Sequence, residues 1–145
     1  MRAVPDLIAD RAAATPTALA LCDGDRRLTY GELIRWADGV AVTLRERGAG
    51  RDVPVGVVGS RSIEYVVGAL GALRAGACYV PIDEKHPDAR RELMLADAGV
   101  CAVLDRAAVA AAHPPIPGHA PTGHPTPAIW PMWSTRPGPP GRRRA

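Results

Sequence analysis

Residues 73–83, LRAGACYVPID, constrain the fold more than any other stretch of this 145-residue chain. Gly76 follows an apolar helical run, at a position where a left-handed helix cap strongly favours glycine. Residues 78–82 are apolar, aromatic or β-branched, which is typical of a strand. Pro81 offers no N–H to a sheet ladder, so we expect it near the strand end or on a sheet edge. The stretch predicts a helix, a tight turn and a strand, and it holds no nucleophile or ligand cluster.

Helical periodicities and short apolar runs alternate along the first 112 residues. The expected order is helix 4–14, strands 18–22 and 26–28, helix 29–47, strand 53–58, helix 63–75, strand 78–82, helix 87–98, strand 100–104 and helix 105–112. The helix at 29–47 is the clearest, because Thr29 and Glu32 form a capping box before a long amphipathic run. Within the helix at 87–98, we expect Leu93, Met94 and Ala98 to face inward. The alternation predicts an α/β fold, a partial parallel sheet with helices on both faces.

Strand burial can also be predicted from composition. Residues 53–58 are apolar almost throughout, as in a central parallel strand that is covered on both sides. The runs at 18–22 and 100–104 have the same character, so we expect buried strands there too.

The net charge of +3 belongs to the C-terminal residues rather than to the body of the chain. Residues 1–112 carry 14 basic against 15 acidic side chains, whereas residues 113–145 carry four arginines and no acid. The last segment also holds ten of the 15 prolines and shows no apolar periodicity, which predicts a disordered tail. We therefore divide the chain into a domain portion, 1–112, and a Pro/Arg-rich tail, 113–145.

Cys22, Cys78 and Cys101 lie far apart, each within an apolar run, which predicts buried free thiols. Their odd number and the lack of an apolar N-terminal segment favour a reducing, cytoplasmic setting. No run approaches the roughly 18 apolar residues of a membrane-spanning helix, so we expect no membrane association. The near-neutral body gives no reason to expect a nucleic-acid partner.

Two places offer residue types that can do chemistry. The segment Gly59, Ser60, Arg61 and Ser62 joins a strand to a helix, and such turns can bind phosphate at the helix N-terminus. The full glycine-rich pattern with its Lys-Ser pair is missing, which favours a plain turn with a serine cap. His86 precedes a proline without a marked titratable partner, which favours a turn residue over a general base. We therefore assign no catalytic, cofactor-binding or metal-binding residue to this chain.

Two segments stand out together, LTYGEL at residues 28–33 and LRAGACYVPID at residues 73–83. With both, the chain resembles the adenylate-forming enzymes, and above all the amino-acid adenylation domains of nonribosomal peptide synthetases. Residues 28–33, LTYGEL, match the first core motif of that family, L-T/S-Y-x-E-L. Residues 73–83 match the second, L-K-A-G-x-A-Y-V-P-I-D, with Arg74 for lysine and Cys78 for alanine. The resemblance covers residues 4–112 and implies the N-terminal part of such a domain.

In the family that the chain resembles, these two motifs are architectural and the chemistry follows later. A phosphate loop of the form Y-T-S-G-S-T-G-x-P-K-G, the substrate pocket and a lysine-bearing C-terminal subdomain are all missing here. The resemblance implies ATP and magnesium for the parent enzyme, with an amino acid and a phosphopantetheine carrier domain as partners. We expect no cofactor in this fragment and no activity from it alone.

The neighbouring reading frame can restore the missing loop. We take each codon from 129 to 145 as the last two bases of one original codon plus the first base of the next. The first two bases of the Trp130 codon (TGG) can then end a leucine codon, and those of the Met132 codon (ATG) can end a tyrosine codon. The whole stretch can spell L-A-Y-V-V-Y-T-S-G-S-T-G-T-P-K-G. This match predicts a frameshift or a sequencing error upstream, between residues 112 and 128.

Two alternatives remain open at this point. The parent can instead be an acyl-CoA or aryl-acid ligase of the same superfamily, which the downstream pocket residues would distinguish. The chain can also be a non-catalytic interaction module, because Pro137, Pro139 and Pro140 followed by residues 142–144 are similar to a polyproline ligand or a nucleic-acid-binding tail. Binding by a peptide of residues 113–145 alone would favour that second reading.

Overall fold

The computed structural model describes residues 2–113, and apart from His113 the predicted tail lies outside the described residues. Every predicted helix and strand before the tail is present, with ends shifted by only one or two residues. In chain order they are α1 Val4–Ala14, β1 Leu19–Asp23, β2 Arg26–Thr29, α2 Tyr30–Glu46, β3 Pro54–Gly59, α3 Ile63–Arg74, β4 Cys78–Asp83, α4 Asp88–Ala98, β5 Ala102–Leu104 and α5 Arg106–Ala111.

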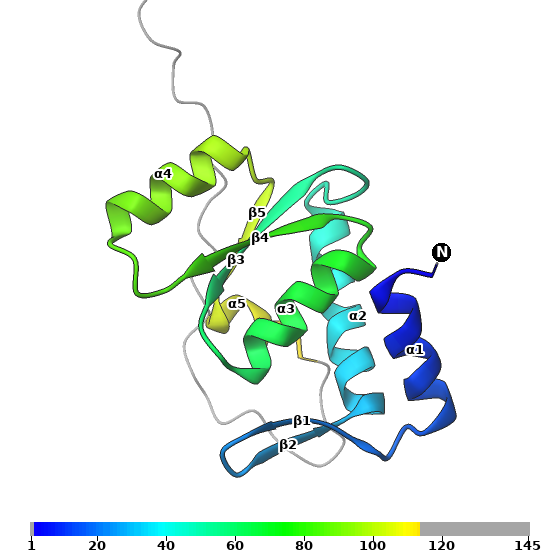
Figure 1. Cartoon of the computed structure of the whole chain (residues 1–145). Coiled ribbons are helices and arrows are strands. Elements are labelled where there is room, and N and C mark those ends of the chain that lie inside the picture. Colours follow the sequence, from blue (N-terminus) through cyan, green and yellow to red (C-terminus); the bar gives the residue numbers. More distant parts are fainter. Residues whose placement is uncertain (1, 114–145) are drawn as a thin grey trace, which may run out of the picture.

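The main sheet has three parallel strands in the order β4-β3-β5, with β3 in the centre as its apolar sequence predicted. Helix α3 connects β3 to β4, and α4 connects β4 to β5 (Figure 1). Strands β1 and β2 form a separate antiparallel hairpin below this sheet in Figure 1. The partial parallel sheet of an α/β fold is therefore confirmed.

Local capping motifs set the element boundaries as predicted. The Thr29 hydroxyl accepts from the backbone N–H of Glu32 at 3.3 Å, and the Glu32 carboxylate accepts from the N–H of Thr29 at 2.8 Å. Gly76 and Gly99 end α3 and α4 with φ angles of +85° and +64°, in the left-handed region that favours glycine. Pro81 lies on β4, an edge strand, where its missing N–H is tolerated.

The core lies between β3 and the pair of helices α2 and α3, which run side by side in Figure 1. Val55 and Val57 point from β3 into this core and are 0% and 1% exposed. Gly71 lets the two helices approach closely, because a Cβ there would lie 2.5 Å from Cγ1 of Val40. Aliphatic side chains and close helix contact thus build the core without phenylalanine, which the sequence lacks.

Three burial predictions are wrong. Strand β1 has no fully buried residue, because the hairpin stands outside the parallel sheet. Cys22 on β1 and Cys78 at the start of edge strand β4 are exposed, and Cys101 is half-buried, although all three thiols are free. Leu93 on α4 is 69% exposed rather than inward-facing, because no other part of the described chain covers the outer side of that helix.

No helix among residues 2–113 is long and apolar enough to cross a membrane.

Candidate functional site

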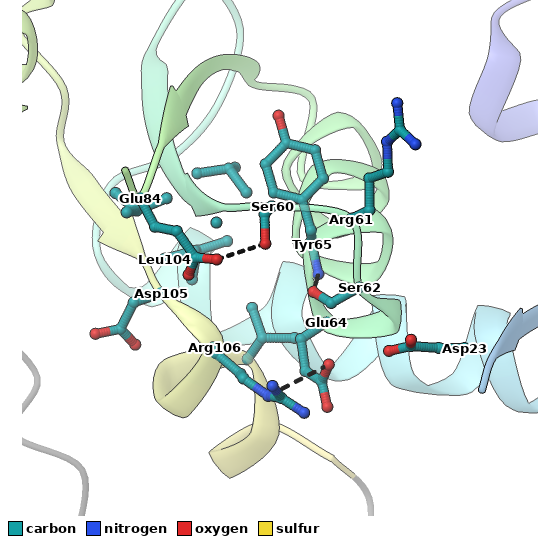
Figure 2. Close-up of a pocket in the computed structure, with 14 residues that line it drawn as sticks. Asp23, Ser60, Arg61, Ser62, Glu64, Tyr65, Glu84, Leu104, Asp105 and Arg106 are labelled. Carbon is teal, nitrogen blue, oxygen red and sulfur yellow. Dashed lines mark hydrogen bonds and ion pairs between the residues drawn. The ribbon is translucent and has the colours of Figure 1, made fainter. Parts of the chain in front are cut away.

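A polar crevice lies at the carboxyl ends of β3 and β5, the place where open α/β sheets usually bind ligands (Figure 2). The turn after β3 and the start of α3 form one side, and the turn from β5 into α5 forms the other. Its volume is about 160 Å³. The lining residues are Asp23, Val57, Val58, Gly59, Ser60, Arg61, Ser62, Glu64, Tyr65, Glu84, Leu104, Asp105, Arg106 and Val109.

The turn that the sequence marked as a possible phosphate site forms one wall of this crevice. Ser62 caps α3, its hydroxyl accepting from the backbone N–H of Tyr65 at 3.2 Å, so the predicted serine cap is confirmed. The Ser60 hydroxyl donates to the carboxylate of Glu84, which comes from the end of β4. A carboxylate therefore faces this turn, and its negative charge opposes the binding of a phosphate.

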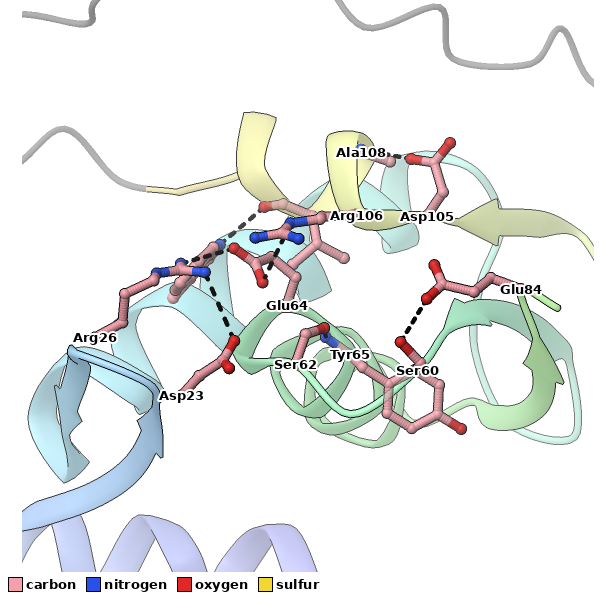
Figure 3. Close-up of polar contacts among 12 residues, drawn as sticks. Asp23, Arg26, Ser60, Ser62, Glu64, Tyr65, Glu84, Asp105, Arg106 and Ala108 are labelled. Carbon is pink, nitrogen blue, oxygen red and sulfur yellow. Dashed lines mark hydrogen bonds and ion pairs between the residues drawn. The ribbon is translucent and has the colours of Figure 1, made fainter.

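Glu64, in the first turn of α3, is the residue at this site that sequence reasoning missed. Its side chain is only 6% exposed. Figure 3 shows this carboxylate between Arg26 from β2 and Arg106 from α5. Nη2 of Arg26 lies 2.7 Å from Oε1 of Glu64, and Nε of Arg106 lies 3.7 Å from Oε2. Oε2 has no hydrogen-bond partner in the part of the chain that the structure describes. Three elements, β2, α3 and α5, thus meet at one carboxylate.

The arginines keep Glu64 ionised in spite of its burial. Loss of solvent favours the neutral carboxyl, but the hydrogen bond from Arg26 and the charges of Arg26 and Arg106 outweigh this effect. They hold the pKa of Glu64 below its ordinary value. The hydrogen bond to Glu64 in turn raises the pKa of Arg26, against the opposing effect of its own burial. The result is a charge cluster that ties the β1–β2 hairpin to the parallel sheet.

A sequence signal for Glu64 exists in its spacing. Glutamate is rarely buried unless it is paired. Here Glu64 shares one helical face with Val67, Gly68 and Gly71, at i+3, i+4 and i+7, and all three are buried. A charged residue on the apolar stripe of a helix predicts a buried ion pair, but the spacing alone does not identify Arg26 as the partner.

The crevice is small and its lining is mainly acidic, which does not favour the binding of a nucleotide. Its volume lies well below the roughly 300–1,000 Å³ of ordinary ligand pockets. Four carboxylates line it against two guanidinium groups. Asp105 is already engaged as the cap of α5, accepting from the N–H of Ala108 at 2.8 Å. Glu84, Glu64 and Asp105 are thus engaged in contacts that hold neighbouring elements together.

His86 lies apart from this crevice. It is half-buried in the turn after β4, and its backbone N–H donates to the carbonyl of Asp83 at 3.2 Å, in keeping with a turn residue. Within residues 2–113, no three His, Cys, Asp or Glu side chains gather in an arrangement that could hold a metal ion. The assignment of no catalytic, cofactor or metal residue stays a prediction.

Comparison with known proteins connects this architecture to a family. The model of the AMP-binding enzyme family matches residues 8–129. Tyrocidine synthase 3 of Brevibacillus parabrevis is 44% identical over 98 residues, which are 68% of this chain but 2% of that protein. Bacitracin synthase 1 of Bacillus licheniformis is 40% identical over 105 residues, which are 70% of this chain and 2% of that protein.

Two solved structures extend the comparison. The nonribosomal peptide synthetase FmoA3 has a TM-score of 0.68 at 39% identity, over 70% of this chain and 11% of that one. The N-terminal subdomain of Klebsiella oxytoca NpsA, in complex with 3-hydroxyanthranilyl-AMSN, has a TM-score of 0.65 at 26% identity, over 72% of this chain and 27% of that one. The chain thus spans only a small part of each relative.

Proposed function

The chain belongs to the AMP-binding enzyme family and corresponds to the N-terminal part of a nonribosomal peptide synthetase adenylation domain, and from this premise we propose its role in a parent reaction. In that reaction the carboxylate of an amino acid attacks the α-phosphate of ATP, pyrophosphate leaves and an aminoacyl adenylate forms. A phosphopantetheine thiol on a carrier domain then takes the acyl group and releases AMP. Magnesium would accompany ATP, and the free cysteines favour a cytoplasmic setting.

The family match along residues 8–129, combined with a small acidic crevice, is the observation that supports this proposal. The matched region supplies the architecture of the first part of the domain. Backbone amides of a glycine-rich loop would have to hold the phosphates, and the sequence contains no such loop. We infer that the chain contributes scaffold to adenylation and that the reacting groups lie elsewhere in the parent.

An aryl-acid ligase is the second candidate for the parent. It is favoured by the similarity to NpsA, whose solved complex holds a 3-hydroxyanthranilyl compound. The identity to that structure is 26%, against 44% to tyrocidine synthase 3 and 39% to FmoA3. The higher identities favour the peptide synthetase branch and therefore an amino-acid substrate.

Activity of the isolated chain tests the scaffold role. Purified chain should neither bind ATP in calorimetry nor exchange radiolabelled pyrophosphate into ATP with any amino acid, with or without magnesium. A complete adenylation domain assayed in parallel provides the positive control. Saturable ATP binding that is lost on Ser60→Ala would contradict the proposal and place a nucleotide at the turn between β3 and α3.

We further propose that the segment 113–145 arose by a change of reading frame from a parent adenylation domain. The support is the neighbouring frame over codons 129–145, which admits the phosphate-loop motif residue by residue. Sequencing the gene and its downstream region should reveal that loop and a continuing adenylation domain in the alternative frame. Stop codons or unrelated sequence in that frame would refute the proposal.

A further inference from the structure

Trp36 joins the last described helix, α5, to α2. Its side chain is 4% exposed, and its indole N–H donates to the carbonyl of Val109 on α5 at 2.8 Å. The same carbonyl accepts from the backbone N–H of Ala112 at 3.2 Å. Helix α5 has only six residues, and a helix this short is unstable in water without contacts to the rest of the protein. The buried hydrogen bond from Trp36 therefore holds the last turn of α5 in place.

His113 follows this turn and lies against the same indole. The centroids of the two rings are 4.3 Å apart, in an edge-to-face arrangement with an interplanar angle of 66°. His113 is half-buried, and its backbone N–H donates to the carbonyl of Ala110 at 3.1 Å. A cation within about 6 Å of an indole centroid is attracted by the ring. A protonated imidazole would therefore hold the end of α5 on Trp36 more firmly than a neutral one.

The charged groups beside this contact belong to α2. The pKa of Glu32 is lowered, chiefly by the hydrogen bond from the backbone N–H of Thr29, and the positive charges of Arg35 and His113 add to this effect against that of burial. Glu32 is therefore ionised over the range in which a histidine titrates, and it favours an imidazolium. Arg35 opposes one, although its Nε donates to the carbonyl of Gly31 at 3.3 Å.

The first turn of α5 is held by groups of another kind. The carboxylate of Asp105 accepts from the N–H of Ala108 at 2.8 Å, and Nε of Arg106 lies 3.7 Å from Oε2 of Glu64. Carboxyl groups ordinarily titrate near pH 4 and guanidinium groups above about pH 12. Of these groups at the two ends of α5, only His113 is an imidazole, so only the last turn changes its charge between about pH 5 and pH 8.

We propose that His113 is a pH-dependent clasp, which holds the last turn of α5 on Trp36 when its ring is protonated and loosens that turn when its ring is neutral. Trp36 and Glu32 both favour the positive form. The stabilisation is therefore present below the ordinary titration range of histidine and is lost as the pH rises through that range. The clasp fixes or releases the end of the described domain, and it does not depend on the proposed function, because it involves contacts within this chain alone.

The fluorescence of Trp36 tests the clasp. Two further tryptophans are present in the full chain, so Trp130→Phe and Trp133→Phe are introduced to leave one indole. An imidazolium in contact with an indole quenches its emission, so the emission should rise as the pH is raised from about 5.5 to 8. Hydrogen exchange of the Trp36 indole N–H and the Ala112 amide, corrected for intrinsic rates, should accelerate about two- to fivefold over the same range.

Three variants identify the titrating group. His113→Gln retains a polar side chain without an imidazole, and both measurements should become independent of pH. Glu32→Gln can still serve in the capping box, but it should move the midpoint of both changes to lower pH, because the carboxylate no longer favours the imidazolium. His86→Gln is the matched control, since it removes a histidine from the turn after β4 and should leave both measurements as they were.

Four results would overturn the proposal. The first is a Trp36 emission that does not change with pH, and the second is a change that persists in His113→Gln. The third is a change in emission without a change in exchange, because protonation would then leave α5 as firmly held as before. The fourth is a change that His86→Gln abolishes, which would assign the titration to a different histidine.

Discussion

Glu64 holds the β1–β2 hairpin to the rest of the molecule through Arg26, which lies 38 positions earlier in the chain. The carboxylate is buried, whereas the Arg26 side chain is 45% exposed and can find water if the pair breaks. The loss of this interaction should therefore cost less than the loss of a fully buried pair. When the ion pair is lost, the hairpin should open before the sheet core does.

Replacement of Glu64 by glutamine tests this local role. Glu64→Gln keeps the volume but removes the charge, and we expect the hairpin to open more easily by about 1–3 kcal/mol. Amide hydrogen exchange at Leu21 and Leu28 should accelerate accordingly, while exchange in α2 stays as in the wild type. Asp25→Asn removes an exposed carboxylate from the same hairpin and is the control. Uniform acceleration throughout the domain would contradict a local role.

The pKa of Glu64 predicts how the stability of the hairpin depends on pH. The pKa of Glu64 in the folded state lies below the unfolded value of about 4.3. The ionised carboxylate therefore stabilises the hairpin above about pH 4.3, and this stabilisation is lost as the pH falls through the folded-state pKa. Exchange protection of the hairpin, corrected for intrinsic rates, should therefore decline in acid in the wild type. Glu64→Gln should show a flat profile over the same range. Parallel profiles in the two proteins would exclude Glu64 as the titrating group.

At the scale of whole elements, the contact between α2 and α3 depends on the absence of a side chain at Gly71. A methyl group there would meet Cγ1 and Cβ of Val40 at 2.5 and 2.7 Å, on a fully buried side chain that has no space to move into. The two helices would have to separate. The packing of this helix pair is therefore sensitive to added volume at Gly71.

Gly71→Ala should weaken the helix pair by about 1–3 kcal/mol, the usual effect of overpacking a filled core. Exchange in both α2 and α3 should accelerate, and near-ultraviolet circular dichroism from buried Trp36 should diminish. Gly50→Ala is the matched control, because nothing lies within 4 Å of a Cβ at that position. If Gly71→Ala leaves the exchange rates and the circular dichroism unchanged, the helices adjust to the added methyl group without loss of stability.

At the scale of the whole molecule, the two sides of the sheet are unequally built. Within residues 2–113, the side of α2 and α3 has an extended buried core, whereas on the side of α4 Ile82 is buried, the valines are half-buried and both strand edges are unpaired. A domain has only about 5–15 kcal/mol of net stability, so incomplete cover of one sheet face is a large deficit. Edges of this kind also favour association between chains.

We therefore expect the isolated chain to give a far-ultraviolet helical signal without a cooperative thermal transition. Calorimetry and amide exchange should locate protection in α2, α3 and β3, with α4 exchanging fastest among the helices of the sheet. A soluble monomer that melts in one sharp, reversible step, with α4 as protected as α2, would show a self-sufficient domain.

The sequence by itself determined the local structure of this protein. The capping box at Thr29 and Glu32, the glycine caps at Gly76 and Gly99, and the serine cap of α3 each involve a few neighbouring residues. Their chemistry can be read without knowledge of the fold. The parallel sheet with β3 at its centre also followed from the sequence, because alternating helices and apolar strands allow few other arrangements.

Only the tertiary structure decided which side chains are buried and which charges meet. Leu93, Cys22 and Cys78 stand in apolar runs, yet they are exposed because no element in the described chain lies over them. Glu64 is charged, yet it is buried because Arg26 reaches it from another part of the sequence. Burial and ion pairing depend on segments that are distant in sequence, and a pattern within one helix or strand carries no information about those neighbours.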